Sequence, residues 1–102
     1  MKKRVERGRN MQKERFKGMA IRFNSEMGPA ETEEFCRLRP EDEKFLQAVY
    51  RSYGFSARGL EKILKAARTA ADLDGERQIG RVHLSEAVSY RSFEKRYWGF
   101  RK

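Results

Sequence analysis

A run of apolar residues at helical spacing constrains the fold of this chain most strongly. Leu60, Ile63, Leu64, Ala67 and Ala71 recur at intervals of three and four residues, so they share one face of an α-helix. Such a face must be buried against another element because a helix gains most of its stability from packing. We therefore predict a long amphipathic helix at the centre of a bundle.

Prolines, glycines and caps divide the rest of the chain into further helices. Pro29 suits the first turn of a short helix that extends to about residue 37, and Pro40 opens another that ends at Gly54. Ser56 is a natural N-cap for the central helix, which Gly75 terminates. A helix is also permitted over residues 2–17, although its apolar residues are few and Gly8 interrupts it, so it needs a packing partner. Apolar positions predicted to face the core elsewhere are Phe35, Cys36, Phe45, Leu46, Val49, Tyr50, Tyr53, Leu84, Ala87 and Val88.

The last helix is predicted to begin after Gly80. Ile79 and Leu84 have the spacing of a hydrophobic staple around an N-cap at that glycine. No segment alternates apolar and polar residues with the period of two that a half-buried strand requires. The predicted fold class is all-α, a small helical bundle.

Composition excludes several classes of protein. The 102 residues suffice for one domain, and one Cys and one His allow neither an internal disulfide nor a Cys/His zinc site. No apolar run approaches the roughly 20 residues that span a bilayer, and no apolar stretch follows the basic start as in a secretory signal. We expect a soluble, cytoplasmic domain with no membrane partner and, at a net charge of +9, a preference for anions.

No catalytic motif is present. The stretch from Gly75 to Gly80 has the two glycines of a P-loop at the correct spacing, but it lacks the Lys and the Ser or Thr that bind phosphate and Mg²⁺. A predicted helix rather than a strand precedes it, so it is a turn. The chain also lacks a Ser/His/Asp set and a metal-binding His pair. It is not expected to catalyse a reaction by itself.

Arg58 is the most informative single residue. With Ser56 as N-cap, Arg58 is the second residue of the central helix, where the helix dipole disfavours a cation by about 0.3–1 kcal/mol in exposed settings. A phosphate group would benefit from the free N–H groups, the dipole and the guanidinium together, and Gly59 would allow close approach. The alternatives are an ion pair with the carboxylates at 41–43 or simple solvation.

The residues around Arg58 resemble a known family. Ser56-Ala57-Arg58, residues 67–73, Ile79, residues 83–87 and Tyr90-Arg91 are similar in order and spacing to the C-terminal helical domain of magnesium-chelatase-related AAA+ ATPases of the ComM and YifB type. The likeness is strongest over residues 55–91, within a helical domain of residues 23–102 that follows a basic arm of residues 1–22. Departures from the family pattern are Ala70 in place of Ile and Gly59 in place of Ala. A weaker likeness covers Val5, Arg9, Gln12 and Arg15, where Gly8 replaces an Ala.

The resemblance implies that the domain is the lid of a nucleotide site. Arg58 matches the sensor-2 arginine that reaches the γ-phosphate of ATP, with Ser56 and Gly59 in support. The chain itself would bind no cofactor alone, since ATP and Mg²⁺ would be held by an upstream P-loop core of the same protein. That parent would be an ATPase forming a homo-oligomeric ring, and its implied output is remodelling of DNA rather than metal chelation.

Several polar residues of the family motif have a structural interpretation. Arg68 and Asp72 are four residues apart on one helix, so we expect a salt bridge or a joint network with Glu86 or Arg91. His83 would be the third residue of its helix and could cap that helix or pair with Glu86. Cys36 is most simply a small core residue.

The basic segments leave alternatives open. Residues 1–23 hold nine Lys or Arg against two Glu, so they could follow a nucleic-acid backbone or face an acidic neighbouring domain. The aromatics Tyr90, Phe93, Tyr97 and Phe100 share one helical face, which could pack on the bundle or contact a partner. Candidate nucleic-acid or partner contacts are Arg4, Arg9, Lys13, Arg15, Lys95 and Arg96.

A rival hypothesis is a free-standing basic module that binds DNA or protein. Residues 56–73 and 81–90 could form a helix-turn-helix pair, but the connection of about seven residues exceeds the usual three or four. The second helix also offers only Arg81 and Ser85 as base-reading residues on its outer face. A protein-interaction domain that uses the aromatic tail is a third alternative.

Overall fold

The all-α prediction is confirmed by a computed structural model, which describes the backbone of residues 2–98 and the side chains of residues 3–90. No strand occurs within residues 2–98. The elements are α1 (Lys2–Arg15), the 3-10 helix η1 (Asn24–Glu26), α2 (Pro29–Phe35), α3 (Pro40–Tyr53), α4 (Ala57–Leu73) and α5 (Arg81–Trp98).

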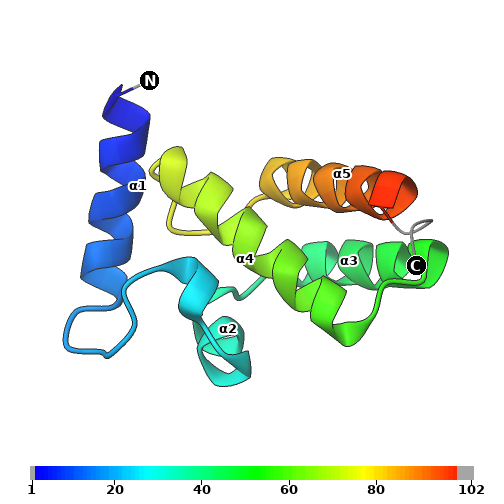
Figure 1. The fold of residues 1–102 in the computed structure, drawn as a ribbon, viewed down its shortest axis with the longest axis horizontal. Coiled ribbons are helices and arrows are strands. Elements are labelled where there is room, and N and C mark those ends of the chain that lie inside the picture. The colour runs from blue at the N-terminus through cyan, green and yellow to red at the C-terminus, as the bar shows by residue number, and fades with distance from the viewer. Residues whose placement is uncertain (1, 99–102) are drawn as a thin grey trace.

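The central position predicted for the amphipathic helix is also observed. Helix α4 contacts α1, α2, α5 and η1, while α3 packs on α5 (Figure 1). Its apolar face carries Ile63, Ala67 and Ala71, none more than 1% exposed. Helix α5 adds Leu84 to the same core, next to the fully buried Ile79 that precedes the helix. The core therefore lies along α4, and α1 covers one end of it.

The ends of the helices follow the predicted signals. Pro29 and Pro40 occupy the first turns of α2 and α3. Gly54 ends α3 in the left-handed conformation at φ 64°, which a side chain would disfavour. Gly75 has φ 72° directly after α4. The hydroxyl of Ser56 accepts a hydrogen bond from the Gly59 N–H at 3.1 Å, as an N-cap does.

Two predicted core positions of α3 lie at the surface. Tyr50 and Tyr53 are 41% and 47% exposed, although Leu46 and Val49 of the same helix are buried. The last turn of α3 lies at the end of the molecule farthest from α1, where few elements can cover it (Figure 1). Tyr53 stacks on Phe55 with ring centroids 5.5 Å apart, and both tyrosine hydroxyls suit a half-exposed position.

The glycine that interrupts α1 is a packing contact. Gly8 is buried, and a Cβ at this position would lie 3.0 Å from Cδ2 of Leu73. The absence of a side chain lets α1 approach the end of α4 closely. Phe16, directly after α1, is 4% exposed and enters the core. The helix ends at Arg15, two residues earlier than predicted, and η1 was not predicted.

Candidate functional site

Arg58 stands exposed at the N-terminus of α4. It is the second residue of the helix, between Ala57 and the buried Gly59, whose N–H is bound by Ser56. Among the residues whose side chains are described, none forms an ion pair or hydrogen bond with its guanidinium. The carboxylate of Asp42, one of the alternative partners, is held by Arg81 at 2.7 Å instead. The site thus combines a free guanidinium with the positive end of a helix dipole.

A second polar centre surrounds the carboxylate of Asp72, whose side chain has no exposed surface. The two terminal nitrogens of Arg15 each donate to one carboxylate oxygen, at 2.6 and 2.8 Å. This bidentate arrangement is the strongest form of Arg–carboxylate pair. The amide of Asn24 donates at 2.9 Å, and Nε of Arg68 lies 3.2 Å away. One buried anion therefore joins α1, η1 and α4.

Arg68 links α4 to the segment that follows it. Its guanidinium donates to the carbonyl oxygens of Glu76 and Arg77 at 2.6 and 2.8 Å, and more weakly to that of Phe35 at 3.4 Å. Burial lowers the pKa of Arg68, and the negative charge of Asp72 opposes that shift. Arg68 and Asp72 are thus buried and ion-paired with each other, although Nε of Arg68 has no hydrogen-bond partner among the described residues.

His83 caps α5 and ties it to α4. The Gly80 N–H donates to Nδ1 of His83 at 2.9 Å, so Nε2 carries the proton and faces Oδ2 of Asp74 at 2.9 Å. Arg4 donates to the other oxygen of Asp74 at 3.0 Å. The hydrogen bond from His83, followed by Arg4, holds the pKa of Asp74 below its usual value. Glu86, the expected partner of His83, is exposed and not in contact with it, and the side chain of Arg91 lies outside the described residues.

The structure divides the candidate cationic contacts into two groups. Arg15 is buried in its ion pair with Asp72, so it belongs to the fold rather than to a contact surface. Arg4 is half-exposed and forms an ion pair with Asp74. Arg9 and Lys13 are exposed. The positions predicted in the C-terminal tail, which are Phe93, Lys95, Arg96, Tyr97 and Phe100, lie outside the described side chains.

Arg81 does not present a free base-reading group. Besides its ion pair with Asp42, its guanidinium lies 4.3 Å from the ring centroid of Phe45. Both contacts hold the side chain against α3. This arrangement weighs against the helix-turn-helix alternative, in which Arg81 would have to reach into a groove.

Sequence analysis did not identify Arg15 and Asn24 as partners of Asp72. If Asp72 is buried, its carboxylate needs more hydrogen-bond donors than Arg68 alone can supply. The sequence does not show which of the nine Lys and Arg of residues 1–23 provides them. The contacts that decide the choice span 57 and 48 residues along the chain. No local signal encodes such a pairing.

The remaining chemistry of the described residues is limited. They contain no group of three His, Cys, Asp or Glu side chains that could hold a metal ion. None of their helices has both the length and the apolar character needed to cross a membrane. Cys36 is buried, and this burial raises the pKa of its thiol to about 11, so it is an unreactive core residue.

Comparison with known proteins identifies the family of this chain. A family model described as "Magnesium chelatase, subunit ChlI C-terminal" matches residues 1–91. The chain belongs to the ChlI C-terminal family. The match includes α1 as well as the bundle, consistent with the packing of α1 on α4.

The curated relatives that match this chain are much longer proteins. The chain is 38% identical over 92 residues to competence protein ComM of Haemophilus influenzae, which covers 90% of this chain and 17% of that protein. It is 39% identical over 74 residues to the uncharacterized protein YifB of Escherichia coli, covering 72% of this chain and 15% of YifB. The chain therefore spans less than a fifth of these relatives. No solved structure matches significantly.

Proposed function

We propose that this ChlI C-terminal domain is the lid of a AAA+ ATPase and that Arg58 contacts the γ-phosphate of ATP bound by a P-loop core outside this chain. The observation that carries the proposal is the free, exposed guanidinium at the N-terminus of α4. A cation at this position does not stabilise its own helix, whereas an external phosphate would give it a counterion.

The local geometry favours a phosphate over a carboxylate of the same chain. Ser56 binds only the Gly59 N–H, which leaves the N–H groups of the two preceding helical residues at the open end of α4. Arg68 and Asp72 fix the far end of the same helix, which holds the backbone of α4 in place within the bundle. A charge-assisted contact of this kind contributes roughly 1.5–3 kcal/mol. That suffices to bias a lid between open and closed states but not to bind a nucleotide unaided.

The lid would report the state of the nucleotide to the rest of the parent protein. Loss of the γ-phosphate on hydrolysis removes the counterion of Arg58 and so weakens the closed position of the lid. By its resemblance to ATPases of the ComM and YifB type, we propose remodelling of DNA rather than metal insertion as the output of a homo-oligomeric ring. The isolated chain would hydrolyse no ATP, because ATP and Mg²⁺ would be held by the P-loop core.

Arg58→Ala in the parent protein tests this role. We expect steady-state ATPase activity to fall by about tenfold or more, in line with the loss of one charge-assisted contact. Arg58→Lys keeps the charge but not the planar fork, so it should restore only part of the activity. Lys62→Ala is the matched control, since Lys62 is an exposed cation one turn further along α4.

The stability of the variants separates a lost contact from a lost fold. Because Arg58 is exposed and lies at the positive end of the helix, Arg58→Ala should leave the midpoint of thermal unfolding unchanged or slightly higher. Wild-type ATPase activity in the folded Arg58→Ala protein would contradict the proposal.

A further inference from the structure

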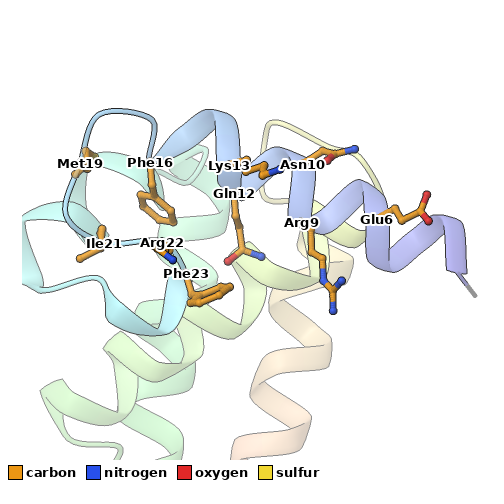
Figure 2. A pocket seen from close by; sticks show the side chains of 10 residues that line it. All are labelled: Glu6, Arg9, Asn10, Gln12, Lys13, Phe16, Met19, Ile21, Arg22 and Phe23. Carbon is orange, nitrogen blue, oxygen red and sulfur yellow. The ribbon is translucent and has the colours of Figure 1, made fainter.

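A cavity of about 740 Å³ lies between α1 and the segment that joins it to α2 (Figure 2). The N-terminus of α4 lies at the opposite end of the molecule (Figure 1). Phe16, Met19, Ile21 and Phe23 supply its apolar walls. This volume falls in the range of sites that hold a small molecule or a few side chains of a partner. Nothing in the lid function described above uses it.

Phe23 is an exposed aromatic on a fixed backbone. Its side chain is 56% exposed. The N–H groups of Arg22 and Phe23 both donate to Oε1 of Glu26, at 2.9 and 3.0 Å. The next residue, Asn24, is held by Gln12 and by the buried Asp72. Met19, which lines the same cavity, is 40% exposed as well, and apolar surface gathered at one cavity is typical of a contact site.

The rim of the cavity is cationic. Arg9, Lys13 and Arg22 line it together with a single carboxylate, that of Glu6. Figure 2 shows Arg9 and Phe23 extending to the same side of α1, with Gln12 between them. A complementary ligand would therefore place an apolar group in the cavity and negative charges around it.

We propose that this cavity, lined by α1 and residues 16–23, binds an acidic protein segment that carries an aromatic or aliphatic anchor. The anchor packs against Ile21 and Phe23, and its neighbouring carboxylates meet the cationic rim. Met19, 40% exposed and unbranched, adapts to the shape of the anchor. A nucleic acid fits less well because only Phe23 offers an open ring face for stacking, whereas Phe16 is 4% exposed.

The test uses fluorescence anisotropy to measure how a fluorescein-labelled peptide binds to the full chain. The peptide is rich in Glu and Asp and carries Phe and Leu one helical turn apart. We expect saturable binding that a peptide with Ser at both apolar positions does not show. Phe23→Ala should weaken binding by about tenfold, as loss of an aromatic anchor does. Lys13→Glu should weaken it several-fold through repulsion of the carboxylates.

Matched variants outside the cavity are the controls. Tyr90→Ala removes an aromatic that is 69% exposed, and Lys62→Glu reverses an exposed cation on α4, so neither should change the affinity. Arg58→Ala should likewise leave peptide binding unchanged, which keeps this inference separate from the lid function. Phe23→Ala should leave thermal unfolding unaltered because the side chain is exposed. Lys13→Glu should lower the unfolding midpoint only slightly, since Lys13 is exposed but lies in the last turn of α1, where the helix dipole favours a cation.

Three results would overturn the proposal. The first is equal binding of the wild-type chain and the Phe23→Ala variant to the peptide, or no binding at all. The second is tighter binding of single-stranded oligothymidylate that Phe23→Ala abolishes, which would make the surface a nucleic-acid site. The third is self-association of the chain that Phe23→Ala prevents, which would make the occupant a second copy.

Discussion

Asp72 shows how a charged residue can occupy the interior of so small a domain. Its carboxylate is fully buried, accepts hydrogen bonds from Arg15 and Asn24, and forms an ion pair with Arg68. Removing an ion from water is costly, and the cost is offset only when the accepting positions are filled with good geometry. Arg15 from α1 and Asn24 from η1 fill these positions, and the charge of Arg68 on α4 lies 3.2 Å away, so the residue determines how those segments meet.

Replacing this carboxylate should destabilise the whole domain. Asp72→Ala leaves Arg15 and Arg68 buried without a counterion, so we expect the free energy of unfolding to fall by about 3–5 kcal/mol. Urea denaturation followed by circular dichroism measures the loss. Glu86→Ala, at an exposed position, should change stability by less than about 0.5 kcal/mol. If the two variants were equally stable, the carboxylate would not be the structural centre described above.

Helix α1 illustrates stabilisation of an element that lacks an apolar stripe. Val5 is 46% exposed, and the helix is held instead by polar contacts with the end of α4. Arg4 pairs with Asp74, and Nε of Arg7 donates to the carbonyl oxygen of Leu73 at 3.2 Å. Gly8 allows the close approach that these contacts need. The basic residues of α1 thus serve the fold as well as any partner.

Substitutions at Gly8 test this packing. Ala costs less conformational entropy than Gly in a helix, and the nearest obstacle to its Cβ is the flexible tip of Leu73 at 3.0 Å. Gly8→Ala should therefore raise the free energy of unfolding by about 0.5–1 kcal/mol. Gly8→Leu should lower it by about 1–3 kcal/mol because the larger side chain forces α1 away from α4. Equal stability of the two variants in thermal unfolding would contradict close packing here.

The joint between α1, α4 and α5 should depend on pH through Asp74. Its pKa in the folded chain lies below the usual 3.8 because of hydrogen bonding by His83 and, after that, Arg4. A carboxyl group whose pKa is lower in the folded chain than in the unfolded chain stabilises the fold at pH values above its unfolded pKa. That stabilisation is lost as the pH falls from about 3.8 through the folded pKa. In Asp74→Asn, stability at neutral pH should be lower and its decline below pH 3.8 shallower. Urea midpoints measured across this range for both proteins provide the check, and parallel curves would refute it.

At the scale of the whole molecule, the basic and acidic segments fold into one unit. Residues 1–23 are strongly basic and residues 24–50 carry seven acids against three bases. Nevertheless, the radius of gyration of 13.9 Å is close to the roughly 13 Å typical of a compact domain of 100 residues. Helix α1 therefore lies against α4 rather than extending into solvent.

Deleting residues 1–15 should prevent cooperative folding. The truncated chain would lack Arg15, leave Asp72 with an incomplete set of donors and open the core beside Phe16. We expect a broad thermal transition without a defined midpoint, monitored by circular dichroism. Deleting residues 99–102, which lie outside the described residues, is the comparison and should keep a sharp transition. A sharp transition in the chain without residues 1–15 would show that residues 1–22 are a separable arm.

The sequence by itself determined the five α-helices, the ends marked by Pro, Gly and Ser56, the family and the position of Arg58 at the start of a helix, although not the end of α1 or the short helix η1. Periodicity, proline and glycine positions and the Ser56 cap act within one or two turns of chain, so they can be read from neighbouring residues. The tertiary structure alone decided that Arg15 and Asn24 complete the Asp72 centre, that His83 pairs with Asp74 and that Phe23 stays exposed. These outcomes depend on which surfaces meet when α1 packs on α4, and the residues involved are far apart in the chain, as Arg15 and Asp72 are at 57 residues. Patterns within one or two turns of helix cannot predict contacts over such separations.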